Sequence, residues 1–103
     1  MTNEEIITHI RDWVSILYSV PKRKLLGRSR ITYIAEARHM VAYVAYADYM
    51  LSLSEIGRLT KRTHATIINS ARRMGELIDT NPTVANRYKT LTKLLKCNSE
   101  TTR

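Results

Sequence analysis

The sequence predicts a small all-α domain that contains a helix-turn-helix. It has three glycines and two prolines among 103 residues, and it shows no sustained alternation of apolar and polar residues, the pattern of a half-buried strand. Apolar residues instead recur at the spacing of an amphipathic helix. A chain of this length is expected to form one domain, here residues 1–97, followed by a flexible tail at residues 98–103.

A proline separates the first two predicted helices. Thr2 and Glu5 have the spacing of a capping box, and the apolar periodicity that follows predicts a helix over Asn3–Tyr18. Pro21 ends this helix or begins the next turn. The segment PKRKLLGRSR, residues 21–30, holds one pair of leucines among basic residues. It predicts a short helix followed by a basic loop.

The third predicted helix, Thr32–Met50, is apolar on nearly all sides. A helix of this kind lies in the centre of a domain, because neighbours must cover it on most sides. We expect its tyrosines to pack in the core rather than to stack on nucleic-acid bases. These tyrosines are Tyr43, Tyr46 and Tyr49.

Two further helices are predicted from their caps. Ser52 and Glu55 have capping-box spacing and precede a helix over Leu53–Leu59. Thr63 is the expected N-cap of a helix over His64–Ile78. The apolar stripe of this second helix, which should face the core, consists of Ile67, Ala71, Met74 and Ile78.

The last predicted helix follows Asn81-Pro82, a cap followed by a proline in the first turn. Its apolar residues are Val84, Tyr88, Leu91, Leu94 and Leu95. The final residues, CNSETTR, have no apolar periodicity. This is why the end of the chain is expected to be frayed.

The chain is strongly basic. Seventeen lysines and arginines against nine aspartates and glutamates give a formal net charge of +8. Such an excess attracts polyanions, although a merely solubilising surface would explain the number equally well. The positions of the charged residues favour nucleic acid as the partner. The helix after Thr63 begins without acidic residues, so its positive end is available to a phosphate. The outward face of this helix holds Ala65, Thr66, Asn69, Arg72 and Arg73, preceded in the turn by Lys61 and Arg62.

Two short capped helices joined by about four residues are the outline of a helix-turn-helix. In this arrangement the second helix lies in the major groove of DNA, and its first residues meet base edges. Here those residues are Thr63, His64 and Thr66. Lysines and arginines nearby would contact phosphates and supply most of the affinity.

Other classes of protein find no support in the sequence. The single Cys97 excludes an intramolecular disulfide and a cluster of zinc-binding thiolates, and the histidines are too scattered to suggest a metal site. Without a Walker A sequence, a nucleophile elbow or a defined carboxylate pair, the chain is predicted to be no enzyme and to need no cofactor. Neither a secretion signal nor an apolar run of about 20 residues is present. We expect a cytoplasmic, nucleoid-associated protein without a membrane span.

Two stretches of the chain resemble a known family. They are SLSEIGRLTKRTHATIINSARRM, residues 52–74, and YSVPKRKLLGRSRITYIAEARHMVAYVA, residues 18–45. In order and spacing they are similar to the C-terminal DNA-binding domain of the bacterial chromosomal replication initiator DnaA, a helix-turn-helix related to that of the Trp repressor. The resemblance spans about Ile6 to Leu95. It implies the same fold and double-stranded DNA as the partner.

The resemblance also implies roles for individual residues. Arg30, with Arg28 as a second candidate, takes the place of an arginine that enters the minor groove. Arg38 and His39 correspond to a pair that contacts phosphate. The remaining correspondences lie in the helix-turn-helix. Leu53 and Ser54 take the positions that contact a thymine methyl group in the family. The positions that read bases and backbone in the major groove are those of Thr63, His64, Ala65 and Thr66.

The chain departs from the family pattern in several places. Thr63 replaces an aspartate and cannot act as an anionic acceptor toward cytosine, and Ala65 replaces a threonine and offers a methyl group suited to thymine. The turn is one residue shorter, with Lys61 and Arg62 where the family has two glycines. The ATPase module of the family has no room in 103 residues. We therefore expect a free-standing DNA-binding protein, for example of a phage or mobile element, or a fragment of a longer protein.

The leading hypothesis is a sequence-preferring double-stranded DNA-binding protein in the control of replication or transcription, with a monomer favoured over a dimer. The changes at Thr63 and Ala65 suggest an alternative, a protein-interaction adaptor or inhibitor that acts on the replication or transcription machinery with weak or no DNA binding. Peripheral attachment to anionic membranes through the first helix and the basic loop is a third hypothesis. The acidic Glu4, Glu5 and Asp12 weaken it.

Overall fold

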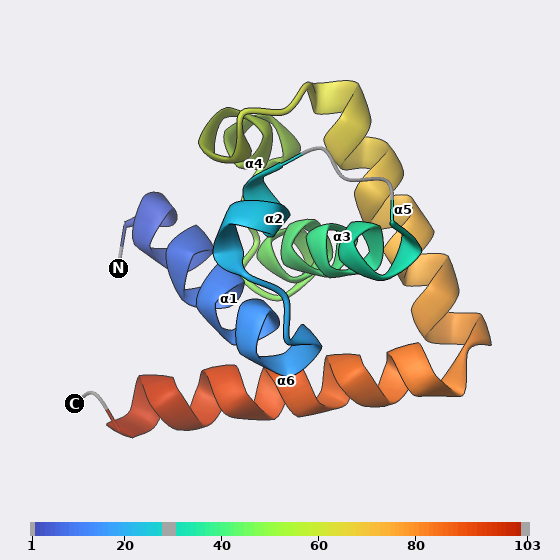
Figure 1. Ribbon diagram of the computed structural model, residues 1–103. Helices are drawn as coiled ribbons and strands as arrows, with labels where there is room; N and C mark the ends of the chain where they lie inside the picture. The colour runs from blue at the N-terminus through green and yellow to red at the C-terminus, as the bar shows by residue number, and fades with distance from the viewer. Residues whose placement is uncertain (1, 28–30, 102–103) are drawn as a thin grey trace.

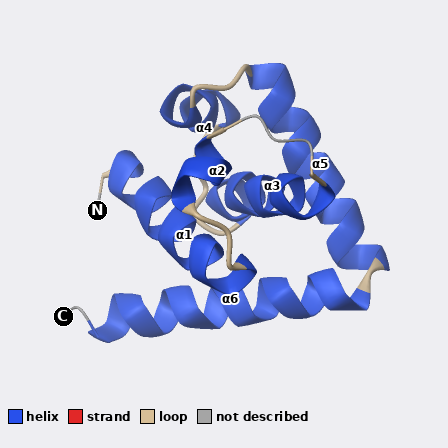
Figure 2. Ribbon diagram, viewed as in Figure 1, coloured by secondary structure: helices blue, strands red, loops and turns tan. Residues whose placement is uncertain are grey.

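The computed structural model of the protein describes the backbone of residues 2–27 and 31–101 and the side chains of residues 2–27 and 31–96. The described residues form helices and turns, with no strand among them (Figures 1 and 2). The helices are α1 (Asn3–Tyr18), α2 (Lys22–Leu26), α3 (Thr32–Ala47), α4 (Leu53–Thr60), α5 (His64–Thr80) and α6 (Pro82–Thr101). The predicted all-α class is confirmed.

Helix α3 lies in the middle of the molecule, as its apolar sequence predicts. It contacts α1, α2, α4 and α5, while α6 runs beneath and packs against α1 and α5 (Figure 1). The side chains of Ala37, Met40, Val44 and Ala45 in α3 are completely buried. Because several of these side chains are small, the neighbouring helices approach α3 closely, and the core forms around it.

The predicted caps are confirmed with one exception. Thr2 and Glu5 form the full capping box, in which the Glu5 N–H donates to Thr2 Oγ1 over 3.1 Å and the Thr2 N–H donates to Glu5 Oε1 over 2.8 Å. At Ser52 only half of the predicted box forms, because the Glu55 N–H donates to Ser52 Oγ over 3.1 Å but the Glu55 carboxylate pairs with Arg58. A salt-bridge partner one turn away therefore takes the carboxylate from the cap.

Helix α3 ends at Ala47, earlier than the predicted end at Met50. The carbonyl of Val44 accepts bonds from the N–H groups of Asp48 and Tyr49 over 2.9 and 3.2 Å, so the helix closes there. Met50 then takes a left-handed conformation, with φ of 60°, and its side chain is 82% exposed. Apolar spacing did not reveal this reversal, because Tyr49 and Met50 continue the apolar pattern beyond the end of the helix.

The core position predicted for the three tyrosines is right for two of them. Tyr43 and Tyr49 are partly buried against the core, and the ring of Tyr43 meets that of Tyr88 edge-on at 5.5 Å. Tyr46 is 46% exposed, so the prediction is wrong there. One side of this last turn of α3 therefore faces solvent.

Helix α6 is longer than its apolar residues predict. It begins at Pro82, after Asn81 Oδ1 accepts bonds from the N–H groups of Thr83 and Val84 over 3.0 and 3.3 Å, which confirms the predicted cap. It continues past Leu95 to Thr101, through residues that carry no apolar stripe but contain neither glycine nor proline. The tail predicted at residues 98–103 thus starts within a helix, and its flexibility stays a prediction.

A partly buried polar cluster joins α1, α3 and α6. The Tyr18 hydroxyl donates to Glu36 Oε2 over 2.5 Å, and Arg87 Nη1 donates to the same oxygen over 3.0 Å. The guanidinium carbon of Arg87 also lies 5.3 Å from the centre of the Tyr18 ring. Burial and the bond to Glu36 raise the pKa of Tyr18 well above its usual range, so the hydroxyl keeps its proton.

Candidate nucleic-acid interface

A tight turn joins α4 to α5 and fixes the direction of α5. Lys61 ends α4 in a left-handed conformation, with φ of 57°, and the Arg62 N–H donates back to the Gly57 carbonyl over 2.9 Å. A Cβ atom on Gly57 would lie 2.8 Å from the carbonyl oxygen of Arg62, closer than side chains tolerate. The glycine at position 57 is therefore what lets the turn fold back over α4.

The first turn of α5 is capped by a hydroxyl. Thr63 Oγ1 accepts a bond from the Thr66 N–H over 3.2 Å and lies 2.8 Å from Thr66 Oγ1. This first turn contains no acidic residue, and His64 and Ala65 are exposed beside the cap. The predicted N-cap is confirmed. With no carboxylate in the first turn, the positive end of the helix dipole stays available to an anion.

Helix α5 divides into a buried and an exposed face. The buried face consists of Ile67, Ser70, Ala71 and Met74, so Ser70 joins the predicted stripe, while Ile78 is only partly buried. Over the first ten residues of α5 the exposed face consists of His64, Ala65, Thr66, Ile68, Asn69, Arg72 and Arg73, and Glu76, Asp79 and Thr80 are exposed toward its end. On this face Arg72 Nη2 donates to Asn69 Oδ1 over 3.1 Å. The predicted outward residues are therefore all at the surface.

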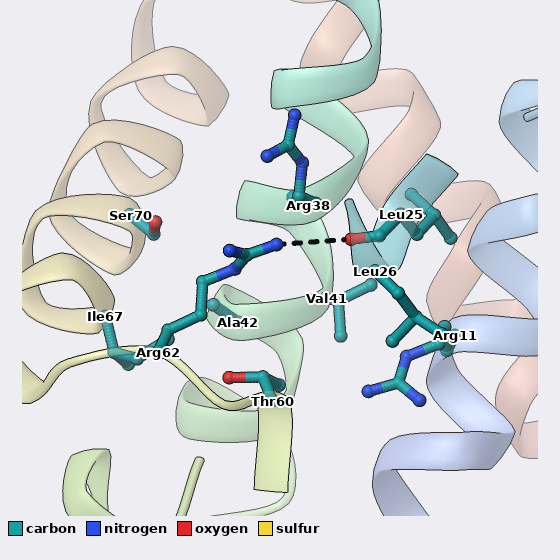
Figure 3. Close-up of a pocket in the computed structure, with 10 residues that line it drawn as sticks. All are labelled: Arg11, Leu25, Leu26, Arg38, Val41, Ala42, Thr60, Arg62, Ile67 and Ser70. Carbon is teal, nitrogen blue, oxygen red and sulfur yellow. Dashed lines mark hydrogen bonds between the residues drawn. The ribbon is translucent and has the colours of Figure 1, made fainter. Parts of the chain in front are cut away.

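Arg62 links the turn before α5 to the end of α2. Its Nη2 donates to the Gly27 carbonyl over 2.8 Å and lies 3.5 Å from the Leu25 carbonyl, the contact drawn in Figure 3. Arg38 of α3 also donates to Gly27, from Nη1 over 3.0 Å. Two guanidinium groups thus meet at a carbonyl oxygen that carries no full charge. The contact holds both side chains in place.

Arg11 of α1 joins these two arginines around a cavity of about 30 Å³, room for one or two water molecules (Figure 3). Burial lowers the pKa of Arg11 and of Arg38, and the nearby charge of Arg62 lowers both further, while the carboxylate of Asp12 opposes the shift of Arg11. Arginine keeps its proton even so. No carboxylate is among the described residues that line the cavity. The sequence does not predict Arg11 at this site, because nothing in its position on α1 shows that it approaches Arg62.

A second, shallower hollow opens beside the first turn of α5. It is lined by Ala35, Arg38, His39, Arg62, Thr66 and Ser70. His39 Nδ1 lies 2.9 Å from Ser70 Oγ, which ties α3 to α5. Burial, followed by the charges of Arg38 and Arg73, lowers the pKa of His39, so its ring is neutral at pH 7. The hollow therefore combines two guanidinium groups, an imidazole and two hydroxyls at one end of α5.

The helix-turn-helix geometry agrees with comparison to known families. Residues 7–74, more than half of the chain, match the family described as bacterial dnaA protein helix-turn-helix. The chain belongs to this family. The DnaA helix-turn-helix is a DNA-binding module, and the matched residues include the whole α4–turn–α5 unit except the last turns of α5. The resemblance found in the sequence is thereby confirmed.

Relatives in the DnaA family are much longer than this chain. Chromosomal replication initiator protein DnaA of Cereibacter sphaeroides is 32% identical over 91 residues, which cover 87% of this chain and 20% of that protein. The protein of the same name from Bartonella quintana is 30% identical over 90 residues, covering 86% and 18%. That of Desulfotalea psychrophila is 38% identical over 63 residues, covering 61% and 13%. The chain thus spans about a fifth or less of the length of these relatives.

The structure brings together several residues of the predicted site. Arg38, His39, Arg62 and Thr66 line the same hollow, and Thr63 lies at its edge through the contact with Thr66. The exposed residues of the predicted site are Ser54, Lys61, Thr63, His64, Ala65, Thr66, Asn69 and Arg73, while Leu53 is half-buried in the first turn of α4. Arg28 and Arg30 lie outside the described residues.

Two other kinds of site find no support in the part of the chain that the structure describes. Over residues 2–27 and 31–101, no helix combines the length and the apolar character that crossing a bilayer would require. Over the same ranges, histidine, cysteine and acidic side chains do not gather in groups of three or more that would hold a metal ion.

Proposed function

We propose that the protein binds double-stranded DNA in a sequence-preferring manner, with the N-terminal half of the exposed face of α5 in the major groove. The observation that carries this proposal is the combination of two guanidinium groups in one hollow with a hydroxyl-capped, acid-free first turn at the same end of α5. Phosphate oxygens bind at helix N-termini and to guanidinium groups. Recognition of base edges requires short side chains that donate and accept hydrogen bonds, and Thr66 and His64 provide them.

The proposed roles divide between reading bases and binding phosphates. His64, Ala65, Thr66 and Asn69 face the base edges, and Thr63 fixes the turn that presents them. The hollow beside them offers Arg38, Arg62 and neutral His39 to a backbone phosphate, and exposed Lys61 and Arg73 flank it. Leu53 and Ser54, at the start of α4, are proposed to contact a thymine methyl group.

The neighbouring minor groove is proposed to receive Arg30, with Arg28 as the second candidate. Gly27, the residue before this segment, is bonded to Arg62, the residue before the α5 cap. The start of the basic segment and the start of α5 are therefore connected through one hydrogen bond. This supports the proposal that both elements engage adjacent grooves of one duplex, with one copy of the protein at each site.

Replication control is the process that the relatives suggest, since they are named as chromosomal replication initiators. We propose that this chain acts at the nucleoid by binding DNA, with no catalytic step of its own, in replication or in transcription control. A free-standing protein of a phage or mobile element would bind a short duplex site, and would either keep other DNA-binding proteins from it or mark it for them.

Selection from a random duplex library, followed by titration over a range of salt concentrations, tests the proposal. If about six phosphates are contacted, log K should fall with log salt at a slope of roughly −5. The matched control is Lys89→Ala in α6, an exposed lysine outside the proposed face, which should leave the slope unchanged. A binding constant independent of salt would contradict the proposal. Recovery of a protein partner after nuclease treatment, with no duplex bound at moderate salt, would support the adaptor function instead.

A further inference from the structure

Ile68 is an aliphatic side chain in the middle of the exposed face of α5. Its side chain is 41% exposed, and it does not belong to the apolar cluster that forms the described core. It lies one turn beyond His64 and Ala65, so these side chains are its neighbours along the helix surface. Arg72 lies one further turn along. Ile68 is therefore not part of the packing that forms the described core.

The surroundings of Ile68 limit what it can bind. Its exposed neighbours along α5 are an imidazole, an amide, a guanidinium and one methyl group, so on this helix face only Ala65 extends the apolar surface of Ile68. Protein-docking patches are larger and continuous. In contrast, the major groove presents single thymine methyl groups surrounded by polar base edges, a pattern that matches one aliphatic side chain among polar ones.

We propose that Ile68 determines specificity by packing against the C5-methyl group of a thymine in the major groove. This rests on the proposed function, because it requires α5 to lie in that groove. Ala65, exposed one turn earlier, would extend the same apolar strip by one methyl group. We therefore expect the DNA target to contain a thymine whose methyl group is contacted by Ile68, in the second turn of α5.

Deoxyuridine substitution tests this directly, because it removes the methyl group and leaves the hydrogen-bonding edges unchanged. In the selected duplex, each thymine is replaced in turn by deoxyuridine and the affinity of the protein is measured. At one position the unaltered protein should lose about 3–5-fold in affinity, the worth of one buried methyl group. Ile68→Ala should bind the thymine and deoxyuridine duplexes equally at that position, and Ile68→Val should keep most of the discrimination.

Ile16→Ala is the matched control, because Ile16 is an exposed isoleucine, 64% accessible, on α1. It should discriminate thymine from deoxyuridine as the unaltered protein does. The inference is overturned if no thymine of the site is sensitive to deoxyuridine, or if Ile68→Ala, folded by circular dichroism, discriminates like the unaltered protein at every position. Either result leaves salt-dependent duplex binding intact, whereas absence of that binding in the unaltered protein contradicts the proposed function itself.

Discussion

Two arginines in this molecule are held in opposite ways. Arg87 of α6 donates to the carboxylate of Glu36, a charge of opposite sign whose side chain is only 14% exposed, and lies over the ring of Tyr18. Arg62, before α5, donates to the uncharged carbonyl of Gly27. Among the described residues, the ion pairs join Lys22 to Asp12, Arg58 to Glu55 and Arg87 to Glu36, and Arg62 is in none of them.

The difference separates charges that stabilise the fold from charges that remain available for binding. A carboxylate both positions a guanidinium and cancels its field, while a carbonyl dipole positions it and leaves most of the field. Around Arg62 the field is reinforced by Arg11 and Arg38. A polyanion near the α4–α5 turn therefore meets a positive surface that is already ordered.

The largest expected effect follows from changing the turn that carries Arg62. Gly57→Ala should lower the free energy of unfolding by about 1–3 kcal/mol, because its Cβ atom would press against the Arg62 carbonyl 2.8 Å away. Urea denaturation followed by circular dichroism measures this change. Duplex affinity should fall as well, since the turn directs α5.

Gly75→Ala is the control for this substitution. A Cβ atom there would meet Tyr43 Cε1 at 3.5 Å, an ordinary contact, and alanine favours a helix over glycine by up to about 1 kcal/mol. We expect Gly75→Ala to be neutral or stabilising. Equal destabilisation by both substitutions would show that the close approach at Gly57 is not what shapes the turn.

Exchanging each of the two arginines for methionine tests the comparison itself. Arg87→Met should cost about 1–3 kcal/mol of stability, because it leaves the Glu36 carboxylate without its cation, and should leave the salt dependence of DNA binding unchanged. Arg62→Met should cost about 0.5–1.5 kcal/mol of stability and make the slope of log K against log salt less steep by about 1. Denaturation and duplex titration on both variants measure the two quantities.

The surface ion pair between Lys22 and Asp12 provides a reference substitution for this experiment. Both side chains are well exposed, at 59% and 41%, so Lys22→Met should change stability by less than about 1 kcal/mol. If Arg87→Met altered the salt slope as much as Arg62→Met, the division between structural and available charges would be wrong.

Substitution of Arg30 and of Arg73 should weaken DNA binding in different ways. Arg30→Ala should weaken binding to the selected site by about 1–3 kcal/mol and relax the base preference at one step, because a groove contact carries sequence information. Arg73→Ala should weaken all duplexes alike, because a phosphate contact carries none. Competition with unrelated duplexes measures both. Unchanged binding by both variants would contradict the docking proposed here.

The smallest expected effect is a dependence of stability on pH that comes from His39. In the fold its pKa lies below the ordinary 6.5, mainly because the ring is buried. As the pH falls below 6.5, the unfolded chain takes up a proton that the folded chain resists, so stability is full above this pH and is lost below it. Denaturation of the protein and of His39→Gln between pH 7.5 and 5 measures the contribution. A pH profile identical in both would contradict it.

Local signals explain why most helices could be predicted from the sequence. The beginning of α1 at Thr2 and that of α5 at Thr63 depend on hydrogen bonds between residues three apart, which a sequence pattern contains in full. The outward position of Thr66 and Asn69 likewise follows from the periodicity of one helix. Where a local competitor exists, the same reasoning fails, as at Glu55, whose carboxylate pairs with Arg58 in place of the cap.

The candidate site depends on contacts that no spacing encodes. Arg62 and Gly27 are 35 residues apart, and His39 and Ser70 are 31 apart, so only the packed fold brings each pair together. Arg11 escaped notice for the same reason. Exposure of Tyr46 also depends on how far neighbouring helices reach, a property of the assembled domain.

The acid-free first turn of α5 has a further consequence for how quickly the protein finds a duplex. The first turn of α1 carries Glu4 and Glu5, while that of α5 carries no carboxylate, so the molecule is electrically asymmetric. A polyanionic rod approaching at random exerts a torque on such a molecule and turns the positive end toward itself before contact. Association should therefore slow sharply as salt is added, while the lifetime of the complex, once formed on its preferred sequence, changes less.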